Sequence, residues 1–155
     1  MVGLTSAHNR EWVEWLGVYD EVLGYDDLDA LDRRPSVYVD VAGSFPVRAA
    51  VHRRLADVLV HSAALGTTHG DPDVFDAPED LPGPRPQLFF APDHLPDRDP
   101  ESAWTDYCAW TDGWLTFARH AGIEAAADVW RQALGGHPPP DTANLIETGY
   151  RSPGS

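Results

Sequence analysis

The fold is decided by the stretch Ser36-Val37-Tyr38-Val39-Asp40-Val41-Ala42-Gly43. Valines alternate with Tyr, Asp and Ala, so both faces are largely apolar, which is typical of a strand buried on both sides of a parallel sheet. Gly43 permits a sharp exit, Ser44 can cap the next helix, and Pro46 suits its first turn. The stretch therefore predicts a strand, a turn and a helix.

The residues that follow extend this pattern into a βαβ unit. Apolar residues recur at helical spacing from 46 to 57, with Arg48, Arg53 and Asp57 placed on the outer side. A second apolar run over 59–65 then predicts a strand parallel to the first, joined by a right-handed crossover. Residues 36–66 therefore predict strand, helix and strand.

The first 35 residues add the same alternation of strand and helix. Residues 1–6 resemble the end of a strand, and a helix is expected from about Ala7 to Leu16 with Gly17 as its stop. A short strand is expected within 18–25, followed by one helical turn at 28–31. The prediction for 1–66 is an α/β fold, a partial Rossmann-like parallel sheet with the order β-α-β-α-β.

The character of the sequence changes after Gly66. Residues 67–100 hold more than half of the 14 prolines, which predicts an extended Pro/Asp-rich connection with a short strand at 88–91. Residues 101–155 are expected to form a helical segment that packs on the sheet. Its two helices run from about Pro100 to Ala121 and from Ile123 to Leu134, and an edge strand is expected at 144–148.

Composition limits the classes of partner. The 155-residue chain has a formal net charge of -14, which argues against nucleic acid and against anionic membrane surfaces. It lacks a signal-like N-terminus and an apolar run of about 20 residues, so we expect a cytoplasmic protein with small-molecule or protein partners. The single Cys108 excludes an internal disulfide framework, and its helical position predicts a buried, inert thiol.

Candidate functional residues lie where the predicted strands end, because open α/β sheets bind ligands at the carboxyl ends of their strands. These ends are Thr5-Ser6, Asp40 to Ser44, and Ala64 to His69. The helix after Ser44 could bind an anion, although Asp40 and Ser44 could equally serve turn and cap hydrogen bonds, which we favour for Ser44. Neither G-x-G-x-x-G nor G-x-x-x-x-G-K-[ST] occurs, so the usual pyrophosphate-binding loop is missing from this chain.

Other clusters are better explained by structure than by chemistry. Two groups could hold a hard metal ion, but acidic residues and Asp-Pro pairs are common in solvated turns, so no metal is expected. The groups are His69, Asp71, Asp73 and Asp76, and His94, Asp97 and Asp99. Trp104, Trp110 and Trp114 are assigned to the core, and His61 to the core or its rim.

An ordered set of motifs resembles an uncharacterised bacterial family of unknown function. That family is related to the zinc-free, quinone-oxidoreductase-like medium-chain dehydrogenase/reductases. The motifs that carry the resemblance are Gly3–Asn9, Leu16–Val22, Tyr25–Leu28, Val39–Gly43, Val60–Ser62, Leu65–His69 and Leu88–Asp93. The resemblance extends from Gly3 to about Thr148.

The resemblance implies an NADP(H)-binding Rossmann fold. Thr5 and Ser6 would end its second strand without the acidic residue that favours NAD, and Arg10 could hold a ribose 2′-phosphate. The nicotinamide ribose would lie beside Asp40, Ala42 and Gly43, and the nicotinamide near Leu65, Gly66 and Thr67.

Family members are about twice as long, with a catalytic domain and a glycine-rich first βαβ unit ahead of the region matched here. Two functions follow as expectations. One is an NADP(H)-dependent oxidoreductase-like domain of unknown substrate, truncated or catalytically incomplete alone, with Tyr38 and His69 as the nearest candidates for an acid. The other is a non-catalytic interaction protein that acts as a homodimer or partner subunit through its exposed sheet edge.

Overall fold

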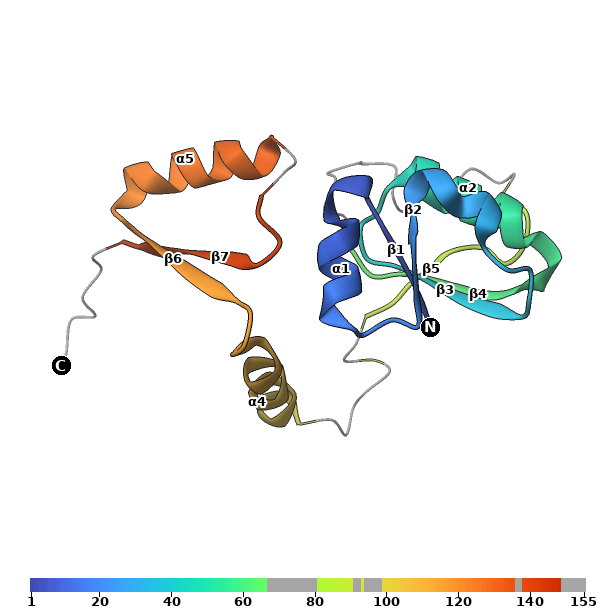
Figure 1. The fold of residues 1–155 in the computed structure, drawn as a ribbon, viewed down its shortest axis with the longest axis horizontal. Coiled ribbons are helices and arrows are strands. Elements are labelled where there is room, and N and C mark those ends of the chain that lie inside the picture. The colour runs from blue at the N-terminus through green and yellow to red at the C-terminus, as the bar shows by residue number, and fades with distance from the viewer. Residues whose placement is uncertain (67–80, 91–92, 94–98, 136–137, 149–155) are drawn as a thin grey trace. The chain divides into compact units, whose positions relative to one another are not determined.

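The computed structural model describes residues 1–66, 81–90, 93, 99–135 and 138–148. The chain divides into two compact units, Met1–Pro96 and Asp97–Ser155 (Figure 1). The first unit contains the elements β1 (Val2–Thr5), η1 (Ala7–Asn9), α1 (Arg10–Leu16), β2 (Glu21–Gly24), η2 (Tyr25–Ala30), β3 (Ser36–Asp40), α2 (Phe45–Leu55), η3 (Ala56–Val58), β4 (Leu59–Ala64) and β5 (Gln87–Leu88). The second contains α4 (Pro100–Thr111), β6 (Thr116–Ala121), α5 (Ile123–Leu134) and β7 (Thr142–Glu147).

The first unit confirms the predicted α/β order. β1 pairs with β2 in parallel, β3 pairs with β4 in parallel, and β4 pairs with β5 in parallel. Its strands form two separate sheets, β1-β2 and β3-β4-β5. Gly17 ends α1 with a left-handed φ of 66°, as its position after an apolar run predicts.

One hydrophobic core joins the two sheets of this unit. Leu28 of η2 packs with Val51 and Leu55 of α2 and with Leu59 of β4, and all four are buried. Leu4 of β1 packs against the same cluster. Helix α2 therefore covers one face of β3 and β4 and also holds the β1-β2 half in place.

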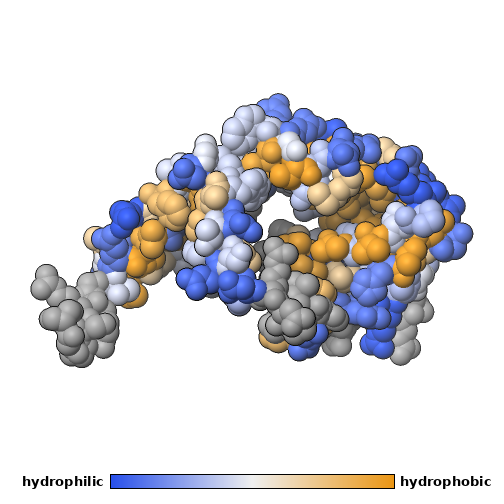
Figure 2. All heavy atoms as spheres, turned by 90° about the horizontal axis from the view of Figure 1, so that it is seen from below, coloured by the Kyte–Doolittle hydropathy of each residue, from blue (hydrophilic) through white to orange (hydrophobic). Residues whose placement is uncertain are grey.

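The prediction that the strand at 36–42 is buried on both faces is wrong. Tyr38 and Asp40 face α2, but Val37 and Val39 are 61% and 51% exposed, and Val60 of β4 is 65% exposed. Apolar side chains lie at the surface of the unit in Figure 2. Apolar residues do occupy both faces of β3, but in the described residues the second face is more than half exposed at Val37 and Val39.

The second unit is not purely helical. α4 begins at Pro100, where the carboxylate of Asp99 accepts the backbone N–H groups of Glu101 and Ser102 at 3.1 and 3.2 Å. The predicted helix to Ala121 is wrong, because α4 ends at Thr111 and β6 follows. β6 pairs in parallel with β7 from Thr116 to Ala121, so a strand more than 20 residues away overrides the local apolar pattern.

The aromatic residues of α4 are more exposed than the sequence predicts. Trp104 and Trp110 are 64% and 47% exposed, and Cys108 is exposed rather than buried. The rings stack along the helix, with Tyr107 5.6 Å from Trp104 and 6.2 Å from Trp110. They pack on one another instead of forming a core. Within the part of the chain that is described, no helix is long and apolar enough to cross a membrane.

Substitution of Leu55 tests the shared core. Leu55→Ala should lower the free energy of unfolding by about 2–5 kcal/mol, because a buried leucine loses its contacts and leaves a cavity. Leu88→Ala, at a leucine that is 62% exposed, is the matched control and should change it by about 0.5 kcal/mol or less. Urea denaturation measures both, and equal effects would contradict this location of the core.

Candidate functional site

The carboxyl ends of β3 and β4 meet at one edge of the sheet. The backbone N–H of Leu65 donates to the carbonyl of Asp40 at 2.8 Å. A side chain on Gly66 would place its Cβ 2.4 Å from the carbonyl oxygen of Val41, so only glycine fits there. The structure therefore brings together the predicted site residues at the ends of these two strands.

A buried ion pair fixes the turn between β3 and α2. Asp40 is 3% exposed and Arg48 is fully buried. The Oδ2 atom of Asp40 lies 2.7 Å from Nε and 2.7 Å from Nη2 of Arg48. The Oδ1 atom accepts the backbone N–H of Gly43 at 2.8 Å, and Gly43 adopts a φ of 71° that favours glycine.

The structure shows which hydrogen bonds Asp40 and Ser44 make in this turn. The carboxylate of Asp40 accepts hydrogen bonds from the backbone of the turn and from Arg48. Ser44 occupies the N-cap position of α2, and its carbonyl accepts the N–H of Arg48 at 3.0 Å. Its side chain makes no capping hydrogen bond, so the prediction that Ser44 caps this helix with its hydroxyl is wrong. Pro46 lies in the first turn as predicted.

A second polar cluster lies beneath α2. The Nε2 atom of His52 is 2.9 Å from Oγ of Ser62, and its Nδ1 atom is 3.0 Å from the carbonyl oxygen of Pro82. Because a carbonyl only accepts, Nδ1 carries the proton and Nε2 accepts the hydroxyl of Ser62. Burial lowers the pKa of His52, so the ring stays neutral.

The serine–histidine pair has a structural role despite its resemblance to an activated nucleophile. Ser62 is 1% exposed and His52 is fully buried, so a substrate cannot reach the hydroxyl. The pair ties α2 to β4 and to Pro82. Arg48 and His52 were not predicted as buried polar residues, although their spacing of four places them on one face of α2.

Tyr38 lies inside the same cluster. Its ring meets that of His52 edge to face, with centroids 6.3 Å apart. Burial, and then the charge of Asp40, raise the pKa of Tyr38 well above the usual range of a phenol. Burial and Asp40 also raise the pKa of Tyr25, which follows β2. Tyr38 therefore keeps its proton under α2, away from the exposed strand ends, which weakens it as a general acid.

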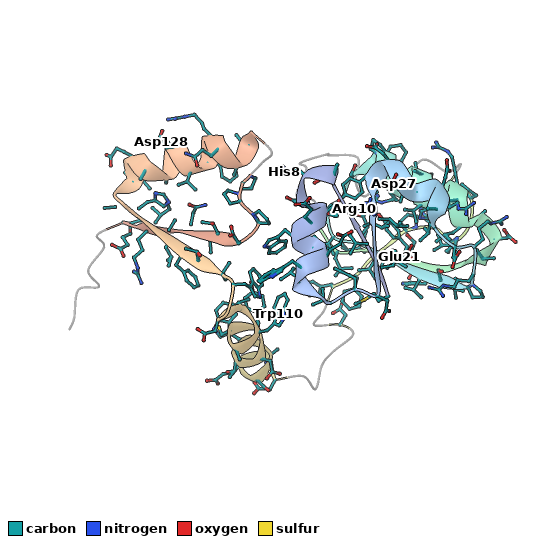
Figure 3. All side chains as sticks on the ribbon, in the orientation of Figure 1. His8, Arg10, Glu21, Asp27, Trp110 and Asp128 are labelled. Carbon is teal, nitrogen blue, oxygen red and sulfur yellow. The ribbon has the colours of Figure 1, made fainter. Side chains whose placement is uncertain are left out.

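Three further predicted residues lie at the end of β1 and just after it. Thr5 is buried at the end of β1, and Ser6 is the N-cap of η1, with its carbonyl 3.1 Å from the N–H of Asn9. Arg10 contacts Glu14 at 3.0 Å and Asp27 at 2.9 Å. Figure 3 shows Arg10 and Asp27 turned toward one another from α1 and η2. A phosphate at Arg10 must therefore compete with two carboxylates.

Several predicted residues lie outside the described residues. These are Thr67, His69, Asp71, Asp73, Asp76, His94 and Asp97, which include most of both possible metal clusters. Asp99 is described and caps α4. His61 is half-buried, as expected of a rim histidine.

The buried ion pair can be tested by a double-mutant cycle. Arg48→Met should cost about 3–5 kcal/mol of unfolding free energy, because it leaves the carboxylate of Asp40 buried without its cation. The double variant Asp40→Asn with Arg48→Met should recover at least about 1 kcal/mol of that loss. Arg33→Met breaks an exposed pair with Asp57 and should cost about 1 kcal/mol or less. Additive losses at Asp40 and Arg48 would contradict the coupling.

His52 should make stability depend on pH. Its pKa in the folded chain is lower than the ordinary value of 6.5, so the neutral ring contributes stability that is fully present above pH 6.5. This contribution is lost as pH falls from 6.5 toward the folded-state pKa. Urea denaturation between about pH 7.5 and 5 should show the wild type losing more stability than His52→Gln. Parallel pH curves would contradict this explanation.

Comparison with known proteins adds one finding about the family. A family model described as "Protein of unknown function (DUF2855)" matches residues 1–139. No curated protein and no solved structure matches the chain.

Proposed function

The chain belongs to the DUF2855 family, and we propose that it is the second part of an NADP(H)-binding, Rossmann-like domain of an oxidoreductase-like protein, catalytically incomplete by itself. The observation that carries the proposal is the edge where β3 and β4 end. Two parallel strands joined by a helix present their carboxyl ends there, which is where α/β sheets bind nucleotides. The kinship with medium-chain dehydrogenase/reductases rests on the motif resemblance and is part of this proposal.

The residues present fit the nicotinamide half of the cofactor. Val41 and Leu65 are exposed apolar side chains at this edge, and Gly66 approaches the carbonyl of Val41 too closely to carry a side chain. The ion pair of Asp40 and Arg48 fixes the turn that follows β3. These groups would bind and orient a neutral ring and its ribose, and exclude water from one side.

The residues present fit the adenosine end of the cofactor only in part. Thr5 and Ser6 end β1 without a carboxylate, which favours NADP over NAD. Arg10 is partly exposed and could bind the 2′-phosphate by exchanging it for Asp27. The sequence has no glycine-rich pyrophosphate loop, so the middle of the cofactor lacks its usual partner in this chain.

The chemistry would come from the cofactor. A nicotinamide supplies hydride transfer to an activated carbonyl or conjugated alkene when it is bound. The described residues at the strand ends position it and do not offer a proton donor, since Tyr38 lies beneath α2. The chain alone is therefore expected to bind the cofactor without turnover.

A second candidate function rests on the exposed sheet face. Val37 and Val39 alternate along β3 with the side chains that face α2 and are more than half exposed, and Val60 of β4 is exposed as well. Such a face favours a protein partner, either a second copy or another subunit. A non-catalytic interaction protein built on part of a Rossmann-like sheet is the alternative that this observation supports.

Cofactor titrations separate the two functions. NADPH should quench tryptophan fluorescence with saturation, corrected for absorption with N-acetyltryptophanamide, and NADH should bind more weakly. Arg10→Ala should weaken NADPH about tenfold and leave NADH unchanged, because only NADPH carries the 2′-phosphate. Arg53→Ala, at an exposed arginine of α2, is the matched control and should change neither. A flat NADPH titration with folded protein would rule out the cofactor proposal and favour the interaction protein.

A further inference from the structure

A row of aromatic side chains is exposed on helix α4 of the second unit. Trp104, Tyr107 and Trp110 follow one another at a spacing of three residues and are 64%, 44% and 47% exposed. Residues three apart are neighbours on a helix surface. The rings of Trp104 and Tyr107 are stacked, with an interplanar angle of 29°. These three residues are called the aromatic row below.

The helix and its own side chains hold these rings in place. The carboxylate of Asp99 caps the first turn of α4 by accepting the N–H groups of Glu101 and Ser102. At the other end, Trp110 meets Trp114 edge to face, with ring centroids 4.9 Å apart. Because the helix and the rings are already ordered, a ligand that binds them loses less affinity to the ordering of side chains.

Each exposed indole of the aromatic row has a carboxylate beside it. Asp106 precedes Trp110 by four positions and Glu101 precedes Trp104 by three, so both pairs are neighbours on the helix surface. Within the part of the chain that the structure describes, neither carboxylate forms an ion pair. The sequence contains no Lys or Arg from residue 99 to 118. The surroundings of the aromatic row are therefore acidic.

An indole beside an unpaired carboxylate suits a guanidinium group. A guanidinium can stack on the ring, since tryptophan is the best aromatic partner of a cation, and can donate two hydrogen bonds to the carboxylate. An apolar groove would instead bury Glu101 and Asp106 away from water, which is costly. A second copy of α4 would place carboxylates against carboxylates. The chemistry of the row therefore favours arginine side chains over both of these occupants.

The two pairs of indole and carboxylate also set a spacing. Trp104 and Trp110 are six residues apart, which is about 9 Å along the helix axis. A polyproline II chain has three residues per turn and rises about 3.1 Å per residue, so every third side chain lies on one face at about the same 9 Å interval. The spacing therefore matches arginines three positions apart in an extended chain.

We propose that α4 binds an extended, arginine-rich segment of a partner protein. One arginine would stack on Trp104 and pair with Glu101, and another, three positions away, would stack on Trp110 and pair with Asp106. Tyr107 would lie against the residues between them. The net charge of -14 of the whole chain attracts such a partner. This interaction goes beyond the proposed function and does not depend on cofactor binding.

The test uses the 155-residue chain and a fluorescein-labelled peptide of three Arg-Pro-Pro repeats. Its fluorescence anisotropy should rise to saturation as protein is added. A control peptide of three Arg followed by six Pro has the same composition, but its arginines point to different faces, so it should bind about tenfold or more weakly. A peptide of three Lys-Pro-Pro repeats should bind about fivefold or more weakly, because an ammonium group lacks the planar fork.

Tryptophan variants locate the binding surface. Trp104→Ala and Trp110→Ala should each weaken the Arg-Pro-Pro peptide about fivefold or more, because each removes one stacking partner. Trp130→Ala is the matched control. Trp130 is 66% exposed on α5, but its neighbours three and four positions away are alanines and a leucine, so this variant should leave affinity unchanged.

A charge variant tests the carboxylates separately. Asp106→Asn should weaken binding about fivefold at 0.05 M salt and less at 0.5 M, where salt screens the pair. Asp128→Asn removes the same charge from α5, where Asp128 already pairs with Arg131, and should change affinity little. Asp106→Asn keeps every ring of the row, so it tests the proposal even if far-ultraviolet circular dichroism shows that a tryptophan variant loses helix.

Four results would overturn the proposal. Anisotropy that does not saturate would show that α4 does not bind arginine in this form. Equal affinity for the two arginine peptides would reduce the interaction to general charge attraction. An equal loss in Trp130→Ala would show that the aromatic row is not special. Self-association of the chain that Trp110→Ala abolishes, measured by sedimentation, would assign the row to a second copy.

Discussion

The buried ion pair of Asp40 and Arg48 is the interaction on which the candidate site depends. Two charges removed from water are costly unless each meets good partners. Asp40 meets Arg48 with one oxygen and the N–H of Gly43 with the other, so its position and that of the turn are fixed together. The carbonyl of the same residue accepts the N–H of Leu65, which carries this constraint to the end of β4. The geometry of the edge thus follows from one carboxylate.

Much of the first unit could be predicted because its signals are local. The alternation at 36–42 marks a strand in any context, and Gly17, Gly43 and Pro46 end or begin elements through their own backbone preferences. The parallel pairing of β3 with β4 followed from the helix between them. These features need no knowledge of distant parts of the chain.

The features that could not be predicted from the sequence depend on contacts with residues far away in the chain. Arg48 was placed on the outer side of its helix because arginine is usually exposed, whereas the carboxylate of Asp40 allows it to be buried. His52 is buried for a similar reason, since Ser62 and Pro82 satisfy both ring nitrogens. The residues of β6 have an apolar pattern that favours a helix. They form a strand because they pair with β7, which follows α5 in the chain. A local sequence pattern contains no information about such distant contacts.

The proposed cofactor site also depends on distant parts of the chain. Thr5 ends β1 and Arg10 begins α1, while Asp40 ends β3 and Gly66 follows β4, and β1 and β3 belong to different sheets. A dinucleotide that bound to both pairs of residues would require a particular separation of the two sheets. In the described residues the two sheets are connected by side-chain packing, because Leu4 of β1 lies against the cluster of Val51, Leu55 and Leu59. Cofactor binding across both sheets would then be thermodynamically linked to the packing of this core, since each would favour the same separation of the sheets.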